Sequence, residues 1–165
     1  MNRLFDMTFQ RIITLYAALA AIALLLTCCH RRPVEFTHQF PGKTWDRFQK
    51  LNFEFPVTDI KHPYDILLKI TYDSTYPFRN FYINVILDMP SGEERINEYD
   101  HGMVNDDGSP VGRPEDDAMT TTFPLWRDLK FSEEGICKLE IEDLIPRPEI
   151  TGIRSLHLII MRKRK

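Results

Sequence analysis

The sequence predicts an all-β fold, an antiparallel β-sandwich of about eight strands. Apolar and polar side chains alternate with a period of two along most of the chain, as they do in strands that bury one face. Turn residues interrupt this pattern at short intervals, and 11 prolines outnumber 7 glycines. The content of 11 Phe, 6 Tyr and 2 Trp also favours extended segments over long helices.

The four clearest strands come first, and we expect them over residues 34–40, 51–57, 66–72 and 81–87. Pro41 and Gly42 end the first of these strands. Pro56 lacks a backbone N–H group, so the end of the second strand should lie at a sheet edge or at a bulge. Four later strands are expected near residues 94–100, 119–125, 136–142 and 153–162.

Helix signals are weak throughout the chain. Thr44 is expected to cap a turn that continues through Trp45 and Phe48, and a second turn is expected over residues 127–131. Neither segment reaches the length at which a helix organises a fold. The longest irregular stretch is expected over residues 100–119, and a loop of this length in a small domain is often functional.

The N-terminal segment has the pattern of a bacterial lipoprotein signal peptide. Arg3 and Arg11 precede the run Ile12–Leu26, which has no charged residue and falls short of the ~20 residues that span a bilayer. The run ends in Leu-Leu-Thr-Cys-Cys at residues 25–29. In such signals the cysteine thiol is acylated, and cleavage leaves this cysteine as the first mature residue. An ordinary secretory signal or a signal anchor with incidental cysteines is the alternative interpretation.

Either cysteine of the pair is a candidate for lipidation. If Cys29 carries the lipid, Cys28 is the small residue before the cleavage point, whereas lipidation of Cys28 would leave Thr27 there. We favour Cys29, because Cys is smaller in shape than the β-branched Thr. The predicted organisation is a signal peptide over residues 1–28, a short tether over 29–33 and one β-sandwich domain over 34–165. A multiply acylated cysteine would anchor this domain to a membrane without a transmembrane helix.

Composition argues against several classes of function. The formal net charge of −3 gives no electrostatic footprint for nucleic acid. With Cys28 removed and Cys29 acylated, Cys137 is the only free thiol, so no intrachain disulfide can form. Cys137 alternates with Leu139 and Ile141, which predicts a buried and unreactive thiol.

Catalytic and metal-binding motifs are missing from the sequence. It has no Gly-x-Ser-x-Gly elbow, no His-Glu-x-x-His pair and no glycine-rich phosphate loop, and its five histidines lack metal-ligand spacing. We therefore predict no enzyme activity, no catalytic residue and no cofactor. Asp106 and Asp107, near Asn105, Asp116 and Asp117, offer oxygen ligands for Ca²⁺. Their spacing does not match an EF-hand, and Asn-Asp-Asp-Gly is also good turn chemistry, so both interpretations stay open.

A short aromatic cluster lies between the third and fourth predicted strands. Tyr76 and Phe78 flank Pro77, which stiffens the connection, and Asn80 follows. One interpretation packs both rings onto the sheet edge. The other presents Tyr76, Pro77, Phe78 and Asn80 to a partner protein, since aromatic anchors often dominate interfaces, and glycan stacking is a variant of this second interpretation.

The same region carries a family resemblance. Residues 76–85 read Tyr-Pro-Phe-Arg-Asn-Phe-Tyr-Ile-Asn-Val, which resembles the Tyr-Pro-aromatic-x-Asn-Leu-x-Leu-x-Val segment of the gliding-motility lipoprotein family GldH of the Bacteroidetes. The order of Glu35-Phe36, Phe40-Pro41, Trp45 and residues 53–55 is similar to the opening of that domain. The loop with Asp106, Asp107, Gly108 and Gly112 and the closing segment 152–160 also match in order, although the family's loop carries a Trp after its first Gly where this chain has Ser109.

This resemblance implies an envelope lipoprotein and supplies no catalytic residue to transfer. The expected function is that of a non-enzymatic accessory or stabilising component of gliding-motility and associated protein-secretion machinery. The expected partners are a membrane, through the lipid anchor, and other envelope, gliding or secretion proteins. The expected location is the outer membrane, with the domain facing the periplasm. The alternative is a surface glycan-binding β-sandwich lipoprotein.

Overall fold

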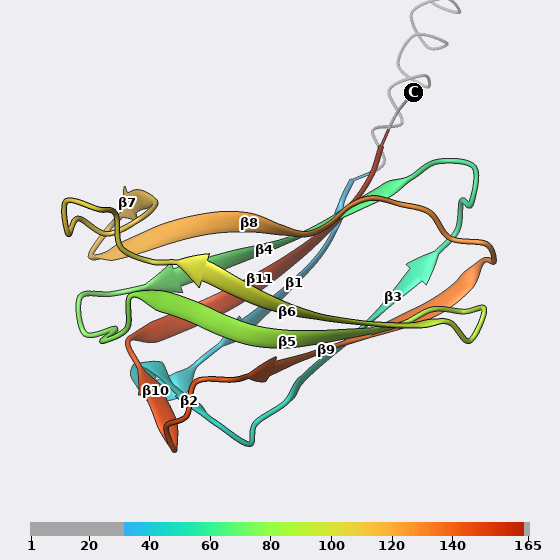
Figure 1. The fold of residues 1–165 in the computed structure, drawn as a ribbon. Helices are drawn as coiled ribbons and strands as arrows, with labels where there is room; N and C mark the ends of the chain where they lie inside the picture. The colour runs from blue at the N-terminus through green and yellow to red at the C-terminus, as the bar shows by residue number, and fades with distance from the viewer. Residues whose placement is uncertain (1–31, 164–165) are drawn as a thin grey trace, which may run out of the picture. The chain divides into compact units, whose positions relative to one another are not determined.

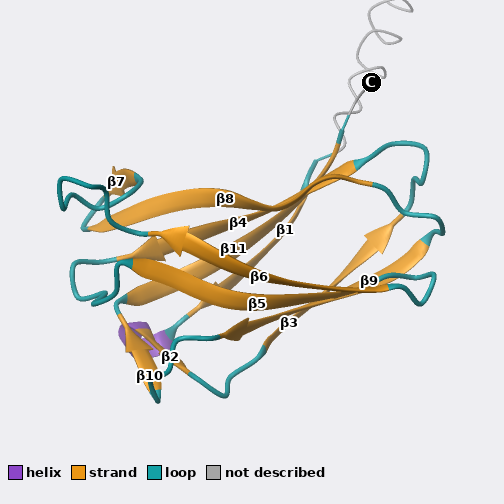
Figure 2. Cartoon of the chain, viewed as in Figure 1, coloured by secondary structure: helices purple, strands orange, loops and turns teal. Residues whose placement is uncertain are grey.

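Strands dominate the computed structural model, which describes residues 32–163. These residues form one short 3₁₀ turn, η1, and strands β1 to β11. Figure 1 shows the strands in chain order, and Figure 2 shows η1 as the helical segment beside β2. Their bounds are β1 Val34–Gln39, η1 Pro41–Lys43, β2 Thr44–Asp46, β3 Leu51–Val57, β4 Tyr64–Tyr72, β5 Asn80–Asp88, β6 Glu94–Gly102, β7 Arg113–Glu115, β8 Ala118–Leu129, β9 Gly135–Asp143, β10 Glu149–Thr151 and β11 Ile153–Arg162.

Two antiparallel sheets form the layers of a β-sandwich. One sheet has the strand order β1-β11-β4-β8-β7, and the other has the order β3-β9-β5-β6. Figure 1 shows these two layers stacked, with the small β10-β2 pair at one end. All the pairings between these strands are antiparallel. The predicted fold class, an antiparallel β-sandwich, is therefore confirmed.

The alternation of the sequence explains how the core forms. In β3 every second residue is buried, from Leu51 to Val57, and the residues between them are exposed. The inward side chains of the two sheets meet in aromatic contacts, such as that of Phe36 on β1 with Phe53 on β3, whose ring centroids lie 5.8 Å apart. Trp45 and Phe81 are both fully buried, and their rings lie 6.1 Å apart. Each such side chain stabilises the fold by roughly 2–3 kcal/mol.

Each of the eight predicted strands is present, and the prediction for Pro56 also holds. Pro56 lies on β3, which has β9 as its one neighbour and is therefore an edge strand. The missing N–H group of Pro56 consequently costs little in the sheet. The predicted irregular stretch is shorter than expected, because β6 continues to Gly102 and β7 pairs with the start of β8.

The first predicted turn is present only at residues 47–48, where the Gln49 N–H donates to the carbonyl of Asp46 at 2.9 Å, and the second predicted turn is wrong. Thr44 begins strand β2, which pairs with β10 from a distant part of the chain, and the 3₁₀ turn lies just before it. Residues 127–129 belong to the end of β8, where Leu129 pairs with Tyr64 of β4. Residues 44–46 and 127–129 are extended because of partners distant in sequence, which local patterns do not reveal.

The predicted signal peptide and both candidate lipidation sites, Cys28 and Cys29, lie outside the described residues, and these assignments stay predictions. Within residues 32–163, no helix has the length and hydropathy that a membrane span requires.

Candidate functional site

The predicted partner-binding residues follow a braced turn between β4 and β5. Asp73 is buried, and its carboxylate accepts hydrogen bonds from the backbone N–H of Thr75 at 2.9 Å and from the Thr75 hydroxyl at 2.6 Å. Lys43 lies 2.9 Å and Arg154 lies 3.4 Å from the other carboxylate oxygen. Burial works to raise the pKa of Asp73, but the hydrogen bonds from Thr75 and Lys43 outweigh burial and hold this pKa far below its ordinary value.

Tyr76 packs into the domain from this turn. Its ring lies edge-on to Tyr72 at 5.8 Å and to Phe78 at 5.7 Å, and its hydroxyl donates to the backbone carbonyl of Asn80 at 2.8 Å. Gly152 fits closely behind it, because a Cβ atom at position 152 would clash with the backbone nitrogen of Tyr76. Pro77 is exposed and Phe78 is half-buried against the core. The structure thus turns Tyr76 inward and leaves Pro77 and part of Phe78 at the surface.

Phe78 and Asn80 line a surface hollow of about 750 Å³ at one end of the β3-β9-β5-β6 sheet. Residues from the start of β5, the end of β6 and the loop after β9 form its walls. The sequence prediction named two of these residues and missed the others. The lining residues are Phe78, Arg79, Asn80, Tyr82, Glu98, Asp100, Ile145, Pro146 and Arg147.

The acidic side chains of the hollow accept hydrogen bonds, whereas its arginines form no ion pair within the described residues. The Tyr82 hydroxyl donates to Glu98, which raises the pKa of Tyr82, and the Asn80 amide donates to Asp100. Arg79 and Arg147 make no ion pair with any other described residue. Two guanidinium groups are therefore available for a ligand beside two exposed, partly engaged carboxylates and an aromatic wall.

A second buried carboxyl supports the other wall of the hollow. Asp143 is 2% exposed, and one of its oxygens accepts a hydrogen bond from the backbone N–H of Ile145 at 2.9 Å. Its other oxygen has no hydrogen-bond partner among the described residues. Burial raises the pKa of Asp143 to about 6. The N–H of Leu144 also donates to the carbonyl of Tyr82 at 3.0 Å, which fastens this loop to β5.

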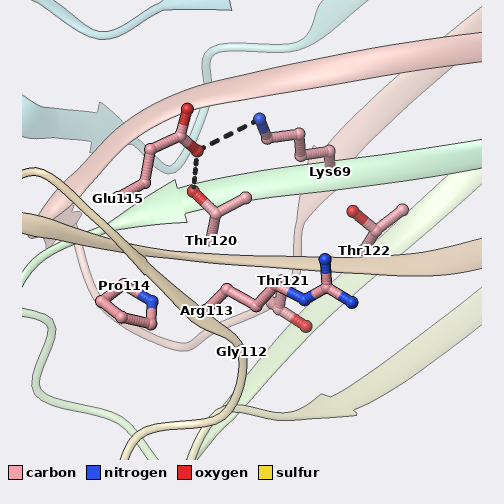
Figure 3. A pocket seen from close by; sticks show the side chains of 8 residues that line it. All are labelled: Lys69, Gly112, Arg113, Pro114, Glu115, Thr120, Thr121 and Thr122. Atoms are coloured by element: carbon pink, nitrogen blue, oxygen red, sulfur yellow. Dashed lines mark hydrogen bonds and ion pairs between the residues drawn. The ribbon is translucent and has the colours of Figure 1, made fainter.

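Another hollow, of about 640 Å³, lies beside β7 and β8 (Figure 3). Glu115 in its wall accepts hydrogen bonds from Thr120 at 2.8 Å and from Lys69 at 3.3 Å, which lower the pKa of Glu115. The lysine and the glutamate of this hollow therefore satisfy each other. Arg113 in the same wall makes no ion pair within residues 32–163, but no aromatic side chain lines this hollow. The first hollow combines two such arginines with Phe78 and Tyr82 and is therefore the better candidate for binding.

The candidate calcium ligands take part in local structure. Asp107 accepts hydrogen bonds from the backbone N–H and the hydroxyl of Ser109, at 2.8 and 2.6 Å, and so closes a turn. Asp106 is exposed, and Asp117 pairs with Arg154 instead. Across residues 32–163 no three His, Cys, Asp or Glu side chains come together as a group that could hold a metal ion.

Cys137 is fully buried and forms no disulfide with any described residue. Burial raises the pKa of its thiol to about 12. The thiol is therefore protonated and shielded at neutral pH, as the alternation around it predicts.

Among the residues that sequence reasoning missed, Arg147 and the buried Asp143 matter most to the hollow. A signal for the second was present, because an Asp at a strand end, followed by Leu-Ile-Pro, is a typical start for a turn held by its own side chain. No local pattern places Arg147 in the same hollow as Arg79, because the two come from separate loops that the sheet brings together.

Together these features define a β-sandwich with one amphipathic surface hollow between two braced loops. The model of the GldH lipoprotein family matches residues 34–160, and the chain belongs to this family, as the resemblance of residues 76–85 predicts. It is similar to the gliding motility lipoprotein GldH of Flavobacterium johnsoniae, with 26% identity over 135 residues that cover 81% of this chain and 84% of the relative.

Solved structures give a more distant likeness. The chain is similar to the VP2 subviral particle of infectious bursal disease virus, with a TM-score of 0.39 and 11% identity, over 79% of this chain and 32% of that chain. It is also similar to dimeric latent PorU from Porphyromonas gingivalis, with a TM-score of 0.39 and 7% identity, over 80% of this chain and 13% of that chain. This chain thus spans about a third of the viral chain, and likeness at these TM-scores supports no inference about function.

Proposed function

We propose that this protein is a non-enzymatic, lipid-anchored lipoprotein of the cell envelope. In this proposal it is an accessory, stabilising component of gliding-motility and associated protein-secretion machinery. Membership of the GldH lipoprotein family and the similarity to the gliding motility lipoprotein GldH of Flavobacterium johnsoniae support the proposal. Acylation of Cys29, or alternatively of Cys28, anchors it, and the domain faces the periplasm from the outer membrane.

The hollow between the two braced loops is the surface that binds a protein partner. The observation that carries this assignment is the two guanidinium groups, Arg79 and Arg147, which have no ion-pair partner within residues 32–163 and lie beside the half-buried Phe78. Arginine and aromatic side chains are the residues that most often dominate interface energy. The hydrogen bonds of Asp73 and Asp143 hold both walls in place before binding, which lowers the entropic cost of association.

The test is co-purification of the tagged, full-length lipoprotein from detergent-solubilised envelopes of its own cells. The informative variant is the double substitution Phe78→Ala with Arg147→Ala, and Lys61→Ala, at an exposed position away from the hollow, is the control. We expect the wild type and Lys61→Ala to recover motility or secretion proteins, and the double variant to lose them by about tenfold or more. Equal recovery by all three proteins would remove the hollow from the proposal.

A surface glycan is the second candidate ligand, because the same hollow combines aromatic rings with an amide and carboxylates. Phe78 and Tyr82 offer faces for a sugar ring, and Asn80 offers hydrogen bonds to hydroxyl groups. Isothermal titration with purified envelope polysaccharide separates the two candidates. Heat of binding that disappears in Phe78→Ala would favour the glycan, and its absence in the wild type would exclude it.

A further inference from the structure

Strand β6 is an open sheet edge. It pairs with β5 on one side and has no neighbour on the other side within the described residues (Figure 1). Its nine residues, Glu94–Gly102, pair with β5 one to one without a bulge. An unpaired edge of this kind is a template to which another extended chain can add.

The hydrogen-bond pattern shows which backbone groups of β6 face outward. At the two ends of the ladder, Met89 N–H donates to the carbonyl of Glu93 at 2.8 Å, and Met103 N–H donates to the carbonyl of Arg79 at 2.7 Å. In an antiparallel ladder every second residue forms hydrogen bonds to the partner strand. Glu93 and Met103, at the two ends, both bond toward β5, so the odd-numbered residues of β6 between them do the same. The outward N–H and C=O groups belong to Glu94, Ile96, Glu98 and Asp100. None of them bonds to the backbone of another described segment.

The other sheet edges in the described residues are less suited to such pairing. On β3, Pro56 lacks a donor, and β7 has three residues, one of which is also a proline. Strand β1 has six residues. Strand β8 has no outer neighbour within the described residues beyond Thr120, where its pairing with β7 ends, but this stretch contains Pro124 and is irregular against β4. Strand β6 is thus the longest sheet edge without a proline. It is also held rigidly, because Tyr99 packs on Phe123 and Trp126 of β8 with ring centroids 6.2 and 6.1 Å away.

The charges on this edge oppose pairing between two copies of the chain. On the solvent face, β6 presents Glu94, Ile96, Glu98 and Asp100, so three of these four side chains are acidic. Every antiparallel register that overlaps three or more of these positions sets an acidic side chain opposite another. Such like-charge pairs destabilise a sheet. The same acids attract a strand with Lys or Arg at alternate positions, and the 56% exposed Ile96 offers an apolar contact between them.

We propose that β6 binds an extended, basic segment of a partner protein as an additional strand of the β3-β9-β5-β6 sheet. This inference rests on the proposed function, in which the protein binds an envelope protein, and it specifies how. Glu98 and Asp100 belong both to this edge and to the wall of the hollow, so the added strand continues into the hollow. Backbone hydrogen bonds supply affinity, and the acids select the basic strand.

Amide hydrogen exchange of the full-length lipoprotein in detergent micelles tests this inference. The probe is a synthetic nine-residue peptide of alternating Lys and Val, and the matched peptide carries Glu in place of Lys. We expect the Lys peptide, at millimolar concentration, to slow exchange within residues 94–102 by about tenfold, and the Glu peptide to have no effect. Equal effects of both peptides, or none, would overturn the inference. Peptide-independent protection that grows with protein concentration would instead indicate self-pairing and also overturn it.

Two variants separate edge pairing from simple charge attraction. Glu98→Pro removes one outward N–H and leaves the bonds to β5 intact, so it should abolish the protection while the thermal unfolding midpoint stays within a few degrees. If this variant unfolds, the double variant Glu94→Lys with Glu98→Lys decides, because it should reverse the preference in favour of the Glu peptide. Glu54→Lys on β3, the opposite edge of the same sheet, is the matched control and should leave the preference unchanged.

The inference and the proposed function fail in different ways. If Glu98→Pro still recovers the partner from envelopes while Phe78→Ala with Arg147→Ala does not, strand addition is wrong and the hollow stands. If the wild type recovers no motility or secretion protein, the proposed function is wrong, whatever the peptides do.

Discussion

Two buried aspartates make the same local turn in opposite electrostatic surroundings. Asp73 and Asp143 each follow or end a strand, and each accepts a hydrogen bond from the N–H two residues later, both at 2.9 Å. Asp73 also meets Lys43 and Arg154, whereas the second oxygen of Asp143 has no partner among the described residues. The pKa of Asp73 is therefore lowered, and that of Asp143 is raised to about 6. One local motif thus stabilises a charge in one loop and penalises it in the other.

The two aspartates have opposite consequences for the pH dependence of stability. Asp73 contributes stability that is complete above its unfolded pKa near 4 and is lost as pH falls through its lowered folded pKa. Asp143 binds its proton more tightly in the folded state than in the unfolded state. Its contribution is therefore complete below pH 4 and is lost as pH rises from about 4 to about 6.

The largest expected effect comes from adding a side chain at Gly152, which packs closely against the backbone of the turn after Asp73. Gly152 has φ +82°, and an added Cβ would clash with the backbone of Tyr76. We expect Gly152→Ala to lower the free energy of unfolding by about 3–4 kcal/mol, because backbone must move. Gly92 has the same φ of +82° and open space around it, so Gly92→Ala should cost about 1 kcal/mol. Urea denaturation measures both, and equal costs would refute the clash.

The next effect concerns the paired aspartate itself. We expect Asp73→Asn to lower the free energy of unfolding by about 2–3 kcal/mol at pH 7, because an amide nitrogen would then face Lys43 and Arg154. Asp106→Asn, at an exposed position, is the control and should change stability by less than about 0.5 kcal/mol. A loss at position 73 no greater than at position 106 would show that the network contributes little.

The unpaired aspartate should respond in the opposite direction. A pKa raised to about 6 corresponds to a penalty of about 1–3 kcal/mol for the ionised carboxyl. We therefore expect Asp143→Asn to stabilise the protein by about that amount at pH 7.5 and to have little effect near pH 4. Thermal unfolding over this pH range gives the measurement. Destabilisation by the substitution at pH 7.5 would mean that the attraction of Arg47, which acts to lower the pKa of Asp143, outweighs burial.

The smallest expected effect shows how much of the stability provided by Asp73 depends on its ion pair with Lys43. Lys43 is about half exposed, so solvent screens its ion pair. We expect Lys43→Gln to cost less than about 1 kcal/mol, because Thr75 and Arg154 continue to bind the carboxylate. Chemical denaturation of this variant beside Asp73→Asn provides the test. A cost equal to that of Asp73→Asn would assign the whole network to one surface ion pair.

Much of the fold follows from local patterns. The alternation around residues such as Phe53 and Phe55 identifies both the strand and its buried face, because burial on one side of a sheet repeats every two residues. Strands β2, β7 and β10 have three residues each and carry no such repeat. They are extended because of their pairing partners, so sequence reasoning took β2 for a turn and missed the other two.

The candidate site was predicted in part. The Tyr-Pro-Phe segment drew attention to Phe78 and Asn80, which do line the hollow, but Tyr76 is turned toward the domain interior. Asp143 is the last residue of β9 and Arg147 lies in the loop after it, and no motif links them to residue 78. Their proximity results from the β5-β9 pairing, which sets Ile83 opposite Asp143.

The positions of the long strands, the side chains that enter the core and the similarity to a family can all be read from the amino-acid sequence. These properties depend on residues that are close together in the chain. Three other properties follow from tertiary contacts: which buried aspartate keeps its charge, which arginines share a hollow and which strand is left at an open edge. Each of these depends on distances between segments far apart in sequence, and electrostatic energies and hydrogen bonds are set by those distances.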